Sequence, residues 1–354
     1  MPSCDPDLLK PNLMTRNRAA LRSGSVTLSL VALSLVCRGQ QLPSTMLLVE
    51  FENNVQYNQD TSDFSKFATD PSVTTAAASK NFQSNVVIAD IVAVNGQPAK
   101  GVFFRERRTI MLAPNPTPGQ AIADVTRNFS GFETAFEILQ PDGTAIGSIF
   151  LSGFGGGSPT PPGAPLVQNL SNLAIVGGTG AFLGARGQGG EAAVAGNSAA
   201  RQASMTEDPS KRRINGGGKM RWVLHVIPMF RPEIVATPAG PAVTHSSDFS
   251  VVTASKPAMP GEVLSLFATG LGPTKPGLDP GQPFPSNPLA AVNSPVNVTV
   301  NGKSAEVLAA VGYPGAADGY QVNFRLPPDT TAGTATIQLS AAWIAGPAAT
   351  IMVR

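Results

Sequence analysis

Short apolar runs, alternating with polar positions and separated by glycine, proline and asparagine-glycine turns, recur along the whole chain. Such alternation is typical of half-buried strands, and tight turns between strands are typical of antiparallel hairpins. Between residues 40 and 230 the runs are Met46–Phe51, Asn85–Val94, Gly101–Leu112, Gly131–Leu139, Thr144–Leu151, one starting at Leu173, one starting at Phe182, and Lys219–Ile227. About eight strands joined in this way predict an antiparallel β-barrel closed around side chains or one small ligand.

A second set of strands is predicted beyond residue 230. Four prolines between Pro228 and Pro241 indicate a linker or an extended lead-in strand. The apolar runs that follow are Gly261–Gly272, Pro295–Val300, Ser304–Val311, Gly319–Leu326, Ala335–Ser340 and Ala349–Val353. About seven strands of this kind are typical of an immunoglobulin-like β-sandwich. We therefore expect an all-β chain, with a barrel over residues 40–230 and a sandwich over residues 231–354.

Composition agrees with this expectation. The 354 residues include 36 glycines and 32 prolines, yet 42% of the chain is hydrophobic and can build cores. This is the composition of a turn-rich folded chain and not of a disordered one.

The first 39 residues have the pattern of a signal peptide. Arg16, Arg18 and Arg22 precede the apolar run Val26–Cys37, and a small residue follows at the spacing of a cleavage site. The run is too short to span a bilayer, so we expect a secreted or cell-surface protein without a membrane span. A second interpretation is a lipoprotein signal with Cys37 as the acylated residue.

Removal of this leader would change the charge and the cysteine content. Cys4 and Cys37 both lie in it, so the mature chain would hold neither a disulfide nor a thiolate metal site. The leader has five basic and two acidic residues, and without it the formal charge of +2 becomes −1. A near-neutral chain argues against nucleic acid as a partner. We interpret the basic clusters Arg105–Arg108 and Lys211–Arg213 as solvated surface.

The stretch Leu173–Gly190 carries the most specific pattern. It predicts an apolar strand, a Gly-Gly-Thr-Gly turn, and a second strand ending in Ala-Arg-Gly at Gly187. A nucleotide-binding Rossmann turn would need a helix next, but the residues after Gly184 cannot start one. The glycine spacing also differs from G-x-G-x-x-G, which favours a barrel over a Rossmann domain.

The string Ile175–Gly187 resembles the late barrel motif of the dirigent family, V-G-G-T-G-x-F-x-x-A-R-G, and more loosely that of the related allene oxide cyclases. The resemblance extends over Gly143–Gly190. It implies a barrel that binds or scaffolds a small apolar or phenolic molecule, with self-association through the barrel as a further candidate property. Leu183 stands where the family usually has a second basic residue.

The C-terminal strands also resemble a known family. The segments GEVLSLFATGLGPT, PVNVTVNGKSAEVL and YQVNFRLPPDTTAGTATIQLS are similar to an uncharacterised C-terminal domain of exported acidobacterial proteins. That resemblance covers Gly261–Arg354 and implies an immunoglobulin-like spacer or surface module without assigned catalytic residues.

The candidate ligand-binding residues are Arg186, Phe182, Glu50, Asp90 and His225. On a regular strand Phe182 and Arg186 share one face, and we expect that face to line the lumen. A buried Arg186 would then need a ligand or a carboxylate partner such as Glu50, Glu52 or Asp90. The alternative is architectural, with Phe182 packed in the wall and Arg186 paired to a barrel carboxylate.

No catalytic or cofactor motif completes this picture. The chain contains no G-x-S-x-G, H-E-x-x-H, P-loop or EF-hand string. His225 and His245 lack companions at ligand spacing, so we expect no metal and no cofactor. His225 lies in the last barrel run, where Trp222 should face the opposite side of the strand.

Three functions remain open from the sequence. The first is a non-enzymatic exported protein that binds a small apolar or phenolic ligand in its barrel. The second is a cofactor-independent cyclase or isomerase that uses the same cavity. The third is a surface or matrix protein whose barrel is filled by side chains. An open apolar lumen with an inward-facing arginine and carboxylate would favour the first two, and a filled lumen would favour the third.

Overall fold

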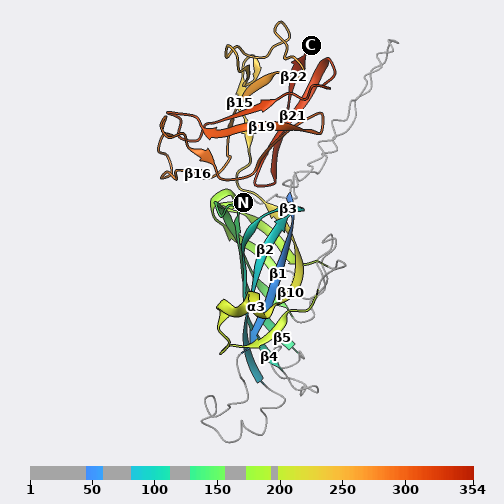
Figure 1. The fold of residues 1–354 in the computed structure, drawn as a ribbon, viewed down its shortest axis with the longest axis vertical. Coiled ribbons are helices and arrows are strands. Elements are labelled where there is room, and N and C mark those ends of the chain that lie inside the picture. Colours follow the sequence, from blue (N-terminus) through green and yellow to red (C-terminus); the bar gives the residue numbers. More distant parts are fainter. Residues whose placement is uncertain (1–44, 59–80, 112–127, 156–172, 193–197) are drawn as a thin grey trace, which may run out of the picture. The chain divides into compact units, whose positions relative to one another are not determined.

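The computed structural model describes residues 45–58, 81–111, 128–155, 173–192 and 198–354 (Figure 1). The expected signal peptide and the acylation site at Cys37 lie outside the described residues. Strands dominate the described part of the chain. Its helices are the short turns η2 (Gly180–Phe182), η3 (Pro209–Lys211) and α3 (Arg212–Asn215). The expected all-β class is therefore confirmed.

Eight strands form a closed antiparallel barrel, as expected. They are β1 (Thr45–Asn58), β2 (Asn81–Val94), β4 (Lys100–Met111), β5 (Asn128–Leu139), β6 (Ala145–Gly155), β7 (Leu173–Gly178), β8 (Arg186–Glu191) and β10 (Gly218–Ile227). Each pairs with the next in this order, and β1 pairs with both β10 and β2, which closes the circle. The short strands β3 (Gln97–Pro98) and β9 (Arg201–Ser204) are added at the edges of β2 and β1.

Tight turns fix the register of neighbouring strands. Asn95 and Gly96 adopt φ values of 50° and 73°, the left-handed conformation of a two-residue hairpin turn. The Asn95 side chain also accepts a hydrogen bond from the backbone N–H of Leu48 at 2.7 Å, which ties this turn to β1. The predicted Asn-Gly turn is therefore confirmed, and it sets which residues of β2 face inward.

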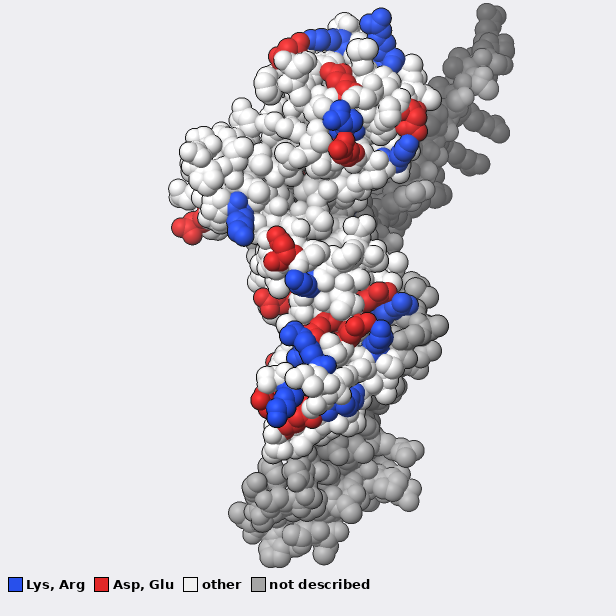
Figure 2. Space-filling model, in the orientation of Figure 1, with Lys and Arg blue, Asp and Glu red and all other residues white. Residues whose placement is uncertain are grey.

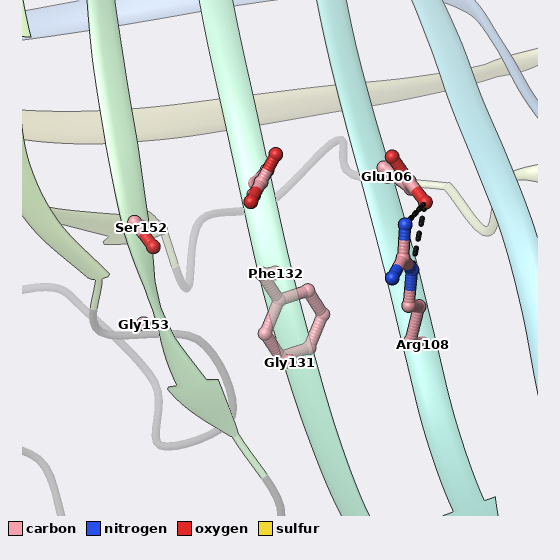
Figure 3. Close-up of a pocket in the computed structure, with 7 residues that line it drawn as sticks. Glu106, Arg108, Gly131, Phe132, Ser152 and Gly153 are labelled. Carbon is pink, nitrogen blue, oxygen red and sulfur yellow. Dashed lines mark hydrogen bonds and ion pairs between the residues drawn. The ribbon is translucent and has the colours of Figure 1, made fainter.

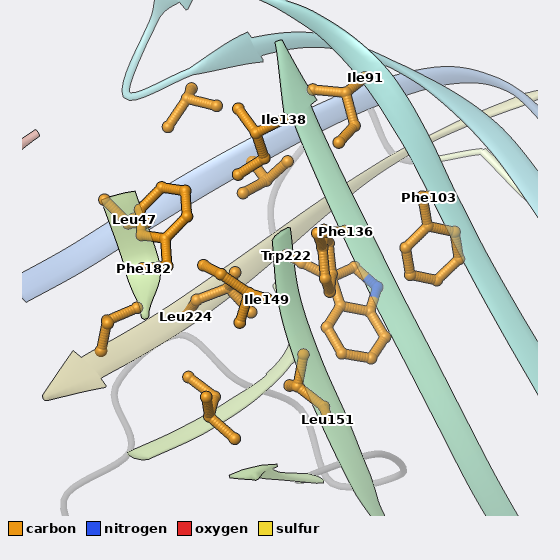
Figure 4. Close-up of a cluster of buried hydrophobic side chains, with 14 of the residues drawn as sticks. Leu47, Ile91, Phe103, Phe136, Ile138, Ile149, Leu151, Phe182, Trp222 and Leu224 are labelled. Atoms are coloured by element: carbon orange, nitrogen blue, oxygen red, sulfur yellow. The ribbon is translucent and has the colours of Figure 1, made fainter. Parts of the chain in front are cut away.

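Aromatic rings fill the middle of the barrel lumen (Figure 4). Phe51 stacks on Phe103 with ring centroids 4.6 Å apart, and Phe103 meets Phe136 edge-on at 5.1 Å. Trp222 packs against Phe136 at 5.5 Å and is fully buried, on the strand face opposite His225 as expected. Stacked and edge-on contacts between aromatic rings stabilise a core beyond the burial of their surface, so this cluster stabilises the barrel interior.

An irregularity in β1 reverses which of its side chains face the lumen. Phe51 pairs with the inward Ile91, but the register shifts between Glu52 and Val55, and Tyr57 pairs with Val86. Val55 and Tyr57 are thereby turned to the outer face. They remain buried there, on the strand segment that pairs with β9.

The strand predicted to start at Phe182 is wrong in its position. Gly180–Phe182 forms the turn η2, and the next strand starts only at Arg186. Gly180 and Gly184 have φ values of 60° and 69°, and such left-handed positions on either side of Phe182 are incompatible with an extended strand. The segment between β8 and β10 contains β9, η3 and α3 where it is described.

The C-terminal region forms a further, separate β-sheet. Its strand order is β11 (Glu233–Ile234), β15 (Val263–Thr269), β20 (Tyr320–Arg325), β19 (Lys303–Gly312), β18 (Val296–Val300), β21 (Gly333–Ala341) and β22 (Ile344–Val353). Short additional strands are β12 (Ala236–Thr237), β13 (Gly240–Pro241), β14 (Val243–His245), β16 (Thr274–Lys275) and β17 (Ala291–Val292). β11 pairs with β15, so the proline-rich stretch contains a lead-in strand of this sheet.

Candidate functional site

A buried arginine lies in the barrel lumen beyond the aromatic cluster. Arg105 on β4 is only 7% exposed and has the same inward parity as Phe103. Its guanidinium carbon lies 5.9 Å from the ring centroid of Phe103 and 5.4 Å from that of Phe132. Burial lowers the pKa of Arg105 to about 10, so the side chain remains charged at neutral pH. Its Nε has no hydrogen-bond partner within the described part of the chain.

Two buried oxygens beside Arg105 also lack partners. Thr134 on β5 pairs directly with Arg105 in the register, and Asn85 on β2 pairs with Arg107, two positions along β4. Both Thr134 and Asn85 are 3% exposed, and neither Oγ1 of Thr134 nor Oδ1 of Asn85 makes a hydrogen bond to a described residue. Unpaired buried polar atoms cost about 1–3 kcal/mol each, so three neighbouring ones mark a position suited to a polar group from outside the fold.

A carboxylate faces Arg105 from the opposite wall. Glu191 on β8 pairs with the inward Trp222, so its side chain belongs to the lumen side. Burial raises the pKa of Glu191, and the attraction of Arg105 only partly offsets this effect. Arg107 also belongs to this end of the lumen, with its guanidinium 5.7 Å from the Phe132 ring and its pKa lowered by burial.

Together these residues form a polar lumen end, which we define as Arg105, Thr134 and Asn85 on one wall and Glu191 on the other. The guanidinium can donate to an oxygen, and the carboxyl group can accept from or donate to a hydroxyl, according to its protonation. Phe132 supplies a flat apolar surface beside Arg105. The arrangement therefore places charged and polar groups next to a phenyl ring in the barrel interior.

The expectation of a buried Arg186 in the lumen is wrong. Arg186 is exposed, and its Nη1 donates to the carbonyl oxygens of Val176 at 2.7 Å and Ala185 at 2.9 Å. Phe182 is buried in the core, as the architectural interpretation required. It lies in the turn η2 and not on a strand. Because β8 starts at Arg186, the two side chains do not share a strand face.

The predicted carboxylates lie on the outer wall. Glu50 forms an ion pair with Arg221 at 2.7 Å, and Asp90 binds Arg212 and Arg213 of α3. His225 faces outward, and its Nε2 is buried without a hydrogen-bond partner in the described ranges. The structure therefore does not bring Arg186, Phe182, Glu50, Asp90 and His225 together.

An arginine and a carboxylate do face the lumen, but they are different residues from those predicted. We interpreted Arg105 as part of a solvated basic cluster, although it lies two residues after Phe103 and therefore on the same strand face. The neighbouring Phe104 obscured this signal, since it offers an equally apolar residue on the other face. Glu191 follows the Gly-rich motif directly, and nothing in its local sequence marks it as inward-facing.

Charges on the outside of the molecule are mixed. Figure 2 shows acidic and basic side chains interspersed over the visible face, without a field of one sign. No described helix is long and apolar enough to cross a membrane. Within the described ranges, no three or more His, Cys, Asp and Glu side chains are grouped so as to hold a metal ion.

Comparisons with known proteins leave the family open. No protein-family model matches the chain, and no curated protein matches it. Among solved structures, a polysaccharide lyase is similar over 77% of this chain with 9% identity and a TM-score of 0.16. The chain spans about a third of that protein, with 34% of its length covered. Fold and site thus define the class: an all-β protein with an eight-stranded barrel and a polar lumen end.

Proposed function

We propose that this chain is an exported, non-enzymatic protein whose barrel binds a small apolar or phenolic ligand at the polar lumen end. The C-terminal sheet would serve as an immunoglobulin-like spacer or surface module. The motif at Ile175–Gly187, with its resemblance to dirigent and allene oxide cyclase barrels, supports a ligand of this class.

The observation that carries the proposal is the environment of Arg105. A charged side chain that is 7% exposed lies between two phenyl rings, and no described residue hydrogen-bonds its Nε. Placing a charge in such surroundings is costly unless a partner compensates it. A phenolic oxygen would supply the missing acceptor, while its ring would pack on Phe132.

A barrel that binds nothing is the second candidate. The stacked rings of Phe51, Phe103, Phe136 and Trp222 fill the middle of the lumen, as a purely structural barrel requires. In that case the polar lumen end would be satisfied by water alone.

Calorimetric titration with 4-propylphenol, and with propylbenzene as the analogue without a hydroxyl, distinguishes these candidates. We expect the phenol to bind and propylbenzene to bind at least about tenfold more weakly, a difference of about 1.4 kcal/mol. Arg105→Met should weaken phenol binding by a similar factor, whereas the exposed Arg186→Leu should leave it unchanged. Absence of phenol binding, or equal binding by Arg105→Met, would reject the proposal.

A further inference from the structure

An apolar trough crosses the outer face of the barrel on β4, β5 and β6. Phe104, Ala135 and Phe150 pair with one another in a single row, so the small Ala135 lies between two phenyl rings. Both rings are 40% exposed, and the neighbouring Val176 of β7 is 48% exposed. These residues line a hollow of about 310 Å³. Isolated apolar side chains are ordinary on a surface, but a contiguous hollowed group indicates an interaction site.

The next row of the same face is acidic (Figure 3). Glu106 and Glu133 are directly opposite each other on β4 and β5, and with Ser152 they line a second hollow of about 240 Å³. Arg108 forms an ion pair with Glu106 at 2.9 Å. Like charges opposite each other destabilise a sheet, and Glu133 has no ion pair among the described residues. The trough therefore offers a free carboxylate next to its apolar floor.

A feature of complementary shape and charge projects from another part of the barrel wall. Ile214 on α3 is 86% exposed, the highest value among the large exposed hydrophobic side chains described. Lys211 is exposed one turn before it, and Arg213 next to it has a side chain that is 72% exposed. Arg212 and Arg213 bind Asp90 of β2, which holds α3 against the barrel. Ile214 is thus an apolar knob flanked by positive charge.

We propose that the chain associates with a second copy of itself by inserting Ile214 of one copy into the Phe104–Ala135–Phe150 trough of the next. Lys211 then lies against Glu133 and supplies the cation that this carboxylate lacks among the described residues of its own chain. Opposite charges at the rim of such a contact fix its register and exclude other partners.

The contact is of the head-to-tail kind. The knob lies beside β2 and the trough lies on β4, β5 and β6, so each copy presents both at once. Two different patches that bind each other build rings or open chains of copies, unless two copies exchange both contacts, which gives a two-fold pair. The inference is independent of ligand binding in the lumen.

Analytical ultracentrifugation of the purified chain over a range of concentrations tests the proposal. We expect the mean mass to rise with concentration, and Ile214→Asp to lower the association constant at least about tenfold. Leu308→Asp is the matched control, because Leu308 is also exposed, at 45%, but lies on the C-terminal sheet. It should associate like the unmodified chain. A chain that remains monomeric at every concentration would overturn the proposal.

Charge reversal gives a second and more specific test. Glu133→Lys and Lys211→Glu should each weaken self-association, since each places like charges at the contact. A mixture of the two variants should associate again, because lysine then meets glutamate in both directions. Circular dichroism checks that each variant is folded. Variants that stay monomeric when mixed, or that associate as strongly as the unmodified chain when separate, would show that another surface is used.

Discussion

Arg105 on β4 and Glu191 on β8 lie on opposite walls of the barrel, with three strands between them in either direction around the circle. Their charges are coupled through the interior, because each influences the pKa of the other. We expect a double-mutant cycle of Arg105→Met and Glu191→Gln, measured by urea unfolding, to give a coupling free energy of about 1 kcal/mol. Pairing Arg105→Met with Glu50→Gln on the outer wall should instead be additive.

The pH dependence of stability should report the burial of Glu191. Its pKa in the folded chain lies above the ordinary 4.5, so the folded state binds this proton more tightly than the unfolded state. This contribution to the free energy of unfolding is full below about pH 4.5 and is lost as the pH rises through the folded pKa. The difference in the free energy of unfolding between the unmodified chain and Glu191→Gln, measured in urea, should therefore change with pH. An identical pH profile for both proteins would contradict a raised pKa.

Asp90 should behave in the opposite way. Burial alone would raise its pKa, but hydrogen bonds from Arg213 and Asn53 and the charge of Arg212 outweigh burial and leave the pKa lowered. Its stabilising contribution is thus present above the unfolded pKa and is lost as the pH falls through the folded pKa. We expect Asp90→Asn to destabilise the fold by about 1–2 kcal/mol at neutral pH.

Limited proteolysis near α3 tests whether the ion pairs of Asp90 stabilise that helix. In Asp90→Asn the chain near α3 should be cleaved faster than in the unmodified protein. The matched control is Asp329→Asn, which breaks an exposed ion pair with Lys303 on the C-terminal sheet. It should leave cleavage near α3 unchanged. Equal cleavage in both variants would assign the stability of α3 to other contacts.

Within the Ala185-Arg186-Gly187 string, the glycine should matter more for stability than the arginine. Gly187 has a φ of 133°, and an added Cβ would lie 1.9 Å from the carbonyl oxygen of His225. Gly187→Ala should therefore cost about 3 kcal/mol or more in chemical denaturation. Gly216→Ala, at a φ of 75° with nothing within 4 Å of the added Cβ, should cost about 1 kcal/mol.

Arg186→Leu supplies the contrasting case. Because Arg186 is exposed and its bonds to described residues go to nearby carbonyl oxygens, the change should alter stability by about 0.5 kcal/mol or less. A loss comparable to that of Gly187→Ala would mean that the guanidinium supports the turn as strongly as the glycine backbone does.

Alternation and turn residues were sufficient to predict most strands of both sheets. The run Met46–Phe51 lies within β1, and Lys219–Ile227 coincides with β10 apart from one residue. The prediction failed where backbone conformation overrides side-chain pattern. Gly180 and Gly184 each leave the extended region, so the strand expected at Phe182 starts only at Arg186.

The site was less accessible to sequence reasoning than the fold. Whether Arg105 points inward depends on a choice between the faces of Phe103 and Phe104, and both faces are equally apolar. The separation of Arg105 and Glu191 across the lumen depends on closure of the barrel, which no local pattern reports. The sequence therefore predicted an arginine and a carboxylate in the lumen but assigned them to the wrong positions.

The composition of β8 has a consequence for the motions of the barrel. At its inward positions 187 and 189 the strand has glycines, and the side chains of Leu151 and Leu224 reach over Gly189. This strand buries little apolar surface of its own and is held mainly by backbone hydrogen bonds to β7 and β10. Such a segment opens at a lower free energy than its neighbours, so its amide hydrogens should exchange before those of β4 and β5. β8 is therefore the strand at which we expect the barrel to open locally.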